Sequence, residues 1–214
     1  MDIHALLLNG LLDALKPLWW LLPLLLLLAV FKSAIFKGWL GETLVRTKAA
    51  RQLDSSIYRP FHDLIIPDSR GTTQLDHIYL SRFGIFVVET KHYRGWIYGS
   101  EQQARWTQVI YKQKHSFQNP LRQNYRHIKA LSALLGLPEN CFHSVIVFSG
   151  DYRFKTPMPA NICDLANFSR YIENIRTPVL DEQQINTAAA ILSSAEFTAT
   201  SAKKRQHIRT LHTR

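Results

Sequence analysis

Three charged residues, Asp76, Glu89 and Lys91, lie at the open end of a segment that has the pattern of a β-hairpin. Two apolar runs, Leu75 to Leu80 and Ile85 to Val88, flank a Ser-Arg-Phe-Gly break that is typical of a turn. With a two-residue loop between the strands, Asp76 lies directly opposite Glu89. Like charges at that spacing repel each other, so this arrangement needs a compensating cation.

The residue types at this end of the hairpin suit a metal site. Alternation along the second strand places Glu89 and Lys91 on one face and Thr90 on the other. Two carboxylates beside an ammonium group are suited to a hard divalent cation such as Mg²⁺, which prefers oxygen ligands. Lys91 would then orient a metal-bound water, or stabilise negative charge on a phosphate under attack.

An ordinary hairpin is the alternative interpretation. Arg82-Phe83 is not typical of a two-residue turn, and a three-residue loop with Gly84 in the left-handed conformation would shift the register by one residue. That shift would send Asp76 and Glu89 to opposite faces. The charges would then point to solvent, or Asp76 would pair with Lys91, and the spacing alone does not choose between the two interpretations.

The overall charge favours acidic partners. The 214 residues have a formal net charge of +10 and an isoelectric point near 9.8, which favours nucleic acid or anionic lipid. The first 40 residues hold three lysines against two aspartates, so most of the excess charge belongs to the rest of the chain. Cys141 and Cys163 have no CxxC spacing and predict neither a zinc ribbon nor a disulfide framework.

The apolar run from Pro17 to Phe31 contains no charged residue and predicts one transmembrane helix over about 17–36. A cleaved signal peptide is the competing interpretation, but residues 1–15 contain no Lys or Arg. Basic residues follow the run, so the positive-inside rule places the C-terminal domain in the cytoplasm. We therefore expect a single-pass protein of the bacterial inner membrane with its N-terminus outside.

Glu42 lies in the first turn of a helix expected over 38–53. Its first possible role is to stabilise the helix N-terminus, where a carboxylate is favourable. Its second possible role is to be a third acidic group of the site. Spacing alone favours the first role.

A second helix is expected from Pro120 to Leu135, with Asn119 as its N-cap and Gly136 as its end. One turn into it, Gln123 and Asn124 would reach a phosphate or be solvated, and we expect Asn124 to be solvated. Further strands are expected over 57–66, 96–98, 106–111, 144–148 and 161–163, and further helices over 165–175 and 181–195.

Several separated motifs together resemble the nuclease-related domain (NERD) family over roughly residues 38–137. They are Gly41-Glu42, Gln74-Leu-Asp-His-Ile78, Gly84-Ile-Phe-Val-Val-Glu-Thr-Lys91, Tyr93-Arg-Gly95, Trp106, and Asn119-Pro120 followed by Gln123-Asn124. That family looks like a branch of the restriction-endonuclease-like PD-(D/E)xK superfamily. The resemblance implies an α/β (mixed) fold, namely a restriction-endonuclease-like mixed sheet flanked by helices, here preceded by one N-terminal transmembrane helix.

The resemblance also implies roles for individual residues. Asp76 takes the acidic position of the second core strand, Glu89 and Lys91 take the ExK of the third, and Glu42 becomes a member of the site. Asp76, Glu89 and the Thr90 backbone carbonyl would hold Mg²⁺, for which Mn²⁺ would substitute, and Gln123 is similar to a helical glutamine near the site. His92 departs from the family, which often has Asn there.

The expected organisation has four parts, at 1–37, 38–137, 138–200 and 201–214. The last part is a basic tail that would bind lipid headgroups, bind nucleic acid or be disordered.

The leading functional hypothesis is a membrane-anchored, Mg²⁺-dependent nuclease that acts on DNA without a small-molecule cofactor. The alternatives are a catalytically weak module that recruits nucleic acid or protein to the membrane, and a lipid-binding scaffold. Restriction-like enzymes often work as dimers, which makes a homodimer compatible with the resemblance.

Overall fold

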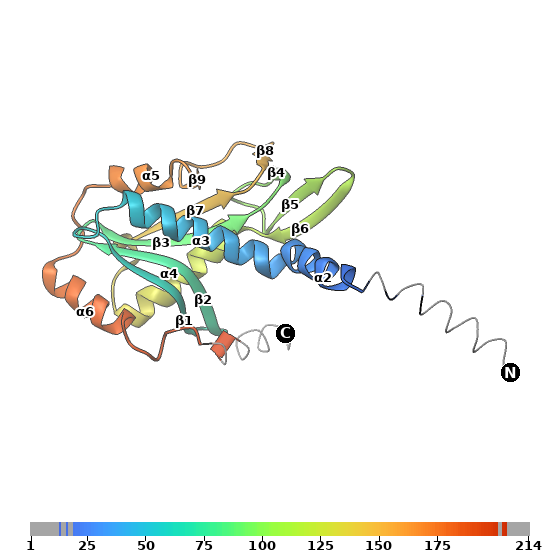
Figure 1. Cartoon of the computed structure of the whole chain (residues 1–214). Helices are drawn as coiled ribbons and strands as arrows, with labels where there is room; N and C mark the ends of the chain where they lie inside the picture. Colours follow the sequence, from blue (N-terminus) through green and yellow to red (C-terminus); the bar gives the residue numbers. More distant parts are fainter. Residues whose placement is uncertain (1–12, 14–15, 17–18, 201–202, 205–214) are drawn as a thin grey trace. The chain divides into compact units, whose positions relative to one another are not determined.

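The computed structural model describes residues 13, 16, 19–200 and 203–204. The chain divides into two compact units, residues 1–40 and 41–214. The start of the predicted transmembrane segment and nearly all of the basic tail lie outside the described residues. The central fold of the second unit is shown in Figure 1.

The N-terminal apolar run does not form one continuous helix. Helix α2 (Leu21–Lys32) ends at Ser33, whose backbone is extended, and helix α3 (Ala34–Gln52) follows at once. The Ser33 hydroxyl accepts a hydrogen bond from the Phe36 backbone N–H at 3.1 Å, so Ser33 caps the second helix. Within the described residues, no single helix is both long and apolar enough to cross a membrane, although the bent pair passes that test together by length and composition.

A five-stranded mixed sheet forms the centre of the second unit, in the order β1-β2-β3-β7-β9. The strands are β1 (Arg59–Asp68), β2 (Gly71–Ser81), β3 (Gly84–His92), β7 (Phe142–Ser149) and β9 (Ile162–Asp164). The pairs β1–β2 and β2–β3 are antiparallel, whereas β3–β7 and β7–β9 are parallel. The expected mixed α/β fold is therefore confirmed.

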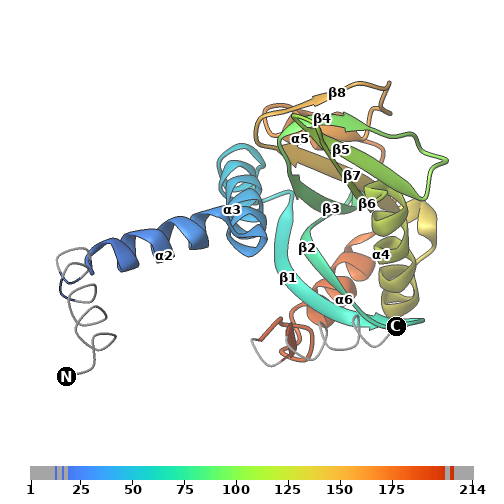
Figure 2. The ribbon, with the colours of Figure 1, turned by 90° about the vertical axis from the view of Figure 1, so that its right-hand side faces the viewer.

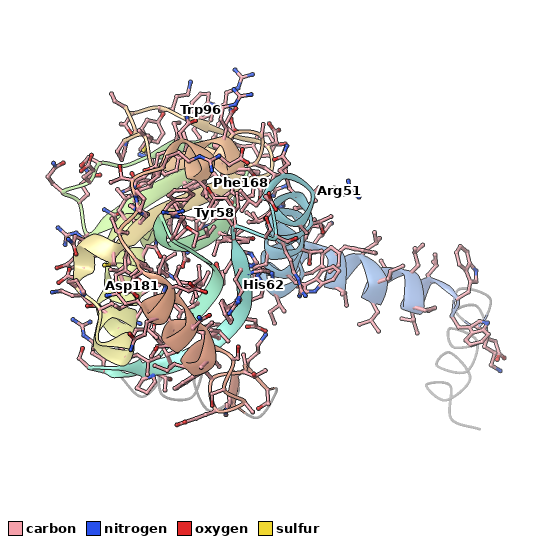
Figure 3. The ribbon with its side chains drawn as sticks, turned by 90° about the vertical axis from the view of Figure 1, so that its left-hand side faces the viewer. Arg51, Tyr58, His62, Trp96, Phe168 and Asp181 are labelled. Carbon is pink, nitrogen blue, oxygen red and sulfur yellow. The ribbon has the colours of Figure 1, made fainter. Side chains whose placement is uncertain are left out.

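Helices cover both faces of this sheet (Figure 2). Helices α4 (Pro120–Leu135) and α6 (Glu182–Leu192) pack on one face, where Ile78 and Val87 are buried. Residues 41–52 of α3 and helix α5 (Phe168–Asn174) pack on the other face, against Tyr79 and Phe86. Tyr58 and Phe168 lie in this second layer (Figure 3). The alternation of side chains along β2 and β3 is thus the predicted one.

A second, four-stranded sheet has the order β6-β5-β4-β8; β4, β5 and β6 are inserted between β3 and α4, and β8 follows β7. Its strands are β4 (Gly95–Tyr98), β5 (Arg105–Ile110), β6 (Gln113–Gln118) and β8 (Tyr152–Phe154), and a short 3₁₀ helix η2 (Glu139–Cys141) precedes β7. The fully buried Trp106 packs with Phe148 of β7 and so joins the two sheets. The polar sequence of β6 carries no strand pattern, and its ladder with β5 is what holds it.

The hairpin register is the one that places the charges at its open end. Ser81 pairs with Gly84, so the loop is Arg82-Phe83, as predicted. The hydrogen-bonded ladder ends at His77 and Val88, one pair before Asp76 and Glu89. Beyond that point β2 continues to pair with β1, whereas β3 pairs with β7. The two strands therefore separate where the predicted site residues begin.

Gly41 allows α3 to approach β3 closely. A Cβ atom on Gly41 would lie 2.8 Å from the Cβ of His92, which is closer than packed carbon atoms allow. Gly38, on the same helix, has open space around it. Close packing of α3 at Gly41 is what brings the next residue, Glu42, to the sheet.

We expect Gly41→Ala to lower the free energy of unfolding by about 1–3 kcal/mol, because the helix must move away from His92. Gly38→Ala is the matched control and should be neutral or stabilising by up to about 1 kcal/mol, since alanine favours the helix. Thermal and chemical denaturation of both full-chain variants measure the difference. Equal effects of the two substitutions would contradict close packing at Gly41.

Candidate active site

A pocket of about 280 Å³ opens where β2 and β3 separate, beside the first turns of α4 and the end of β6. It is lined by Glu42, Thr73, Gln74, Asp76, Gln118, Gln123, Arg126 and His127. Three of the predicted site residues, from α3, β2 and α4, therefore meet at one pocket. Glu89 and Lys91 lie behind it on β3, where they contact the same helix.

Glu89 and Lys91 form a close ion pair on β3. The Lys91 Nζ atom lies 2.6 Å from Glu89 Oε1 and also donates to Gln123 Oε1 at 3.0 Å. Burial tends to lower the pKa of Lys91, but the Glu89 carboxylate more than offsets this and raises it. Lys91 is therefore held as a cation, aimed by Glu89 and Gln123.

His127 holds the second oxygen of Glu89. Its Nε2 atom lies 3.1 Å from Glu89 Oε2, and its Nδ1 atom lies 2.8 Å from the Thr73 hydroxyl. Both His127 and Glu89 are almost completely buried. The sequence interpretation missed His127, although it follows Gln123 by four residues and so lies on the same face of the helix.

Asp76 and Glu89 differ in their tendency to ionise. Burial, followed by the nearby Glu89 and Glu42 carboxylates, raises the pKa of Asp76 well above its usual range. Burial also acts to raise the pKa of Glu89, but Lys91 and His127 outweigh it and lower this pKa to about 2. The backbone N–H of Thr90 donates to Asp76 Oδ2 at 2.8 Å, which is the contact that places this carboxyl group beside β3.

Glu42 faces the same pocket from α3. Its pKa is raised, first by burial and then by the carboxylate of Asp63. The opposing influences are the ammonium groups of Lys204 and Lys91, and Lys204 also lies 2.5 Å from Asp63. The pocket thus gathers acidic groups whose ionised forms repel one another.

The donor atoms at this site are oxygens, the ligand type that Mg²⁺ prefers. Asp76 Oδ1 has no hydrogen bond within the described part of the chain, and each Glu89 oxygen retains a lone pair beyond the one that its partner uses. Among the described residues, no group of three or more His, Cys, Asp and Glu side chains is placed to hold a metal ion. Two carboxylates, the Thr90 carbonyl and retained waters are nevertheless an oxygen set of the kind that Mg²⁺ takes.

Asn124 corrects one expectation. It is completely buried instead of solvated, and its amide donates to the Val87 carbonyl at 2.8 Å and to the Ser144 hydroxyl at 2.9 Å. The reason is its position one turn before Ile128, on the face of α4 that packs on the sheet. Asn124 therefore fixes α4 to β3 and β7 and does not reach the pocket.

We expect His127→Ala to lower the free energy of unfolding by about 2 kcal/mol or more, because Glu89 loses a partner inside the protein and the Thr73 hydroxyl keeps only its contact with Arg126. His115→Ala, at an exposed position on β6, is the matched control and should leave stability unchanged. Urea denaturation of the full-chain variants measures both. Identical midpoints would show that the contact between His127 and Glu89 carries no net stabilisation.

The comparisons with known proteins show the family of the chain. An uncharacterized protein of Bacillus anthracis is 52% identical over 101 residues, which are 47% of each chain. The present chain therefore spans about half the length of that curated relative. No solved structure matches the chain significantly. The family model described as nuclease-related domain matches residues 37–149, more than half of the sequence, and the chain belongs to the NERD family.

Proposed function

We propose that this NERD protein is a metal-dependent nuclease that hydrolyses phosphodiester bonds of DNA and is anchored to the bacterial inner membrane. The observation that carries the proposal is the convergence of Asp76, which lines the pocket, with Glu89 and Lys91 behind it, where Lys91 Nζ lies 2.6 Å from Glu89. A module that only attracts phosphate has no need for paired carboxylates in such a place.

The protein's own groups have distinct roles in this proposal. Lys91, held as a cation, would bind a phosphate oxygen and stabilise the charge that develops on it during attack. Gln123 and Glu89 hold the Lys91 ammonium group in position. His127 holds the Glu89 carboxylate, so its role is one of positioning. Glu42 lines the pocket from α3, where its carboxylate would stabilise a bound cation or accept the proton that the attacking water releases.

Mg²⁺, held by Asp76, Glu89 and the Thr90 carbonyl, would supply an activated water as the nucleophile and neutralise charge on the phosphate. The raised pKa of Asp76 supports this assignment, because burial and then the neighbouring carboxylates disfavour its charged form, and a bound cation would oppose both effects.

The membrane anchor is proposed for the apolar segment around α2. Before Lys32, helix α2 contains only Leu, Pro, Ala, Val and Phe, and most of these side chains are exposed. An exposed apolar helix of this kind requires an apolar environment. The basic residues that follow it would keep the second unit in the cytoplasm.

A recruitment module is the second candidate. Lys91 is already paired with Glu89 and Gln123, so the pocket would hold nucleic acid with little turnover if this pairing persists with substrate bound. The same acidic residues would then contribute to folding and not to hydrolysis.

We expect the full chain, purified in a mild detergent, to cleave DNA in the presence of Mg²⁺ or Mn²⁺ and to lose this activity with a chelator. Glu89→Gln and Lys91→Ala should each reduce the rate by about 100-fold or more, because the first weakens the hold on the metal and the second removes the cation that stabilises charge on the phosphate. Gel assays with linear, circular and single-stranded DNA measure the rate.

Arg170→Ala, an exposed substitution on α5, is the control and should cleave DNA at the wild-type rate. If well-folded protein shows no cleavage and both site variants bind DNA as the wild type does, the nuclease proposal is wrong and recruitment is favoured.

The anchor is tested with Leu25→Arg/Leu26→Arg, two substitutions within α2. Each arginine in the centre of a membrane segment costs about 3 kcal/mol, so an alkaline wash should release this variant from membranes but not the wild type. Thr47→Arg/Ala50→Arg, at exposed positions on α3, adds the same charge and should stay bound. Release of the wild type by the wash would rule out the anchor.

A further inference from the structure

The β5–β6 hairpin projects beyond the rest of the second sheet (Figure 1), and its last residue, Gln118, lines the pocket. Its strands have six residues each and would extend about 20 Å at about 3.3 Å per residue. Gln118, the last residue of β6, lines the pocket, and Tyr111-Lys112 forms the two-residue turn at the far end. The hairpin is thus a ribbon that begins at the candidate site.

One face of the ribbon continues from the pocket to the tip. Residues two apart on a strand share a face, so Ser116 and Lys114 lie on the face of Gln118. Arg105 is paired with Gln118 across the ladder and lies on this face too, where its guanidinium donates to the Ser116 hydroxyl at 2.8 Å and to the Ser116 carbonyl at 3.0 Å. Apart from Val109, which is paired with Lys114, this face is a polar and basic row that begins at the pocket.

The segment that contains the ribbon has only positive charge. Residues 102–138 contain no Asp or Glu, and their basic side chains are Arg105, Lys112, Lys114, Arg122, Arg126 and Lys129. Arg126 pairs with Asp68 and Lys129 pairs with Glu139, whereas Lys112 and Lys114 have no carboxylate partner in the described part of the chain. Both lysines are exposed at the end of the ribbon and are available to an external anion.

Tyr111 is an unusual residue at the tip. Its backbone has a φ of 53°, in the left-handed region that disfavours a tyrosine, and its side chain is 97% exposed. Contacts within the protein do not account for keeping a large aromatic ring there, and a contact with an external partner would.

We propose that the β5–β6 ribbon binds in the major groove of a B-form DNA duplex whose scissile phosphate lies in the pocket. The major groove of B-form DNA admits a two-stranded β-ribbon, whereas the major groove of an RNA duplex is too deep and narrow. Lys112 and Lys114 contact phosphates, and Tyr111 contacts the duplex at the tip. The inference rests on the proposed function only in placing a phosphate in the pocket.

The test measures binding of the full chain to a fluorescent DNA duplex by anisotropy, with a chelator present so that no cleavage occurs. Lys112→Ala/Lys114→Ala should weaken binding about tenfold and reduce the slope of log affinity against log salt by about two, one for each lost phosphate contact. Arg170→Ala/Arg176→Ala removes the same charge from exposed positions elsewhere and should leave both quantities unchanged.

Tyr111→Asn provides a second variant, since asparagine tolerates the left-handed conformation. It should keep or raise thermal stability and weaken binding to the DNA duplex severalfold. An RNA duplex and single-stranded DNA of the same sequence should bind more weakly than the DNA duplex and be insensitive to both ribbon variants.

Three results would overturn the inference: equal weakening by the two double variants, tighter binding of RNA, or an effect of the ribbon variants on anionic vesicles and not on DNA. Ribbon-dependent DNA binding without any cleavage would keep this inference and remove the nuclease proposal. If the ribbon variants cleave DNA at the wild-type rate, the nuclease proposal is kept and this inference is removed.

Discussion

Burial of the Glu89 carboxylate is the constraint on which the rest of the candidate site depends. Its side chain is only 4% exposed, and its two oxygens are held by Lys91 at 2.6 Å and by His127 at 3.1 Å. A buried carboxylate that loses its partners costs several kcal/mol. The folded state therefore requires α4, which carries His127, to lie against β3 at the position where His127 contacts Glu89. The same contacts aim Lys91 at the pocket, so stability and site geometry have one cause.

Two asparagines hold α4 in the position in which its His127 contacts Glu89. Asn119 caps the helix through the Leu121 N–H and donates to the carbonyls of Ser100, Glu101 and Gln103, which joins the helix start to the second sheet. Asn124, one turn later, donates to β3 and β7. Because buried amides that lose such bonds cost free energy, both residues act against any sliding of the helix. The insertion of β4, β5 and β6 before α4 therefore positions the β5–β6 ribbon as well as the helix.

The sequence by itself determined the elements with strong local patterns. The caps of α4, the continuous apolar strand β7 and the alternation along β2 and β3 follow from side-chain chemistry and periodicity. The register of the β2–β3 hairpin needed the assumption of a two-residue loop, which the structure confirms. Family motifs added the grouping of Glu42 and Gln123 with the acidic pair, which spacing alone did not favour.

Only the tertiary structure decided which polar side chains are buried and what they contact. His127 and Asn124 have the same appearance in the sequence as solvated helix residues, yet one holds Glu89 and the other fixes the helix to the sheet. Strand β6 exists because β5 pairs with it, and the apolar run near the N-terminus is broken because Ser33 caps the next helix. In each case the deciding partner is chosen by packing or by a competing hydrogen bond, and no periodicity within the segment itself records that choice.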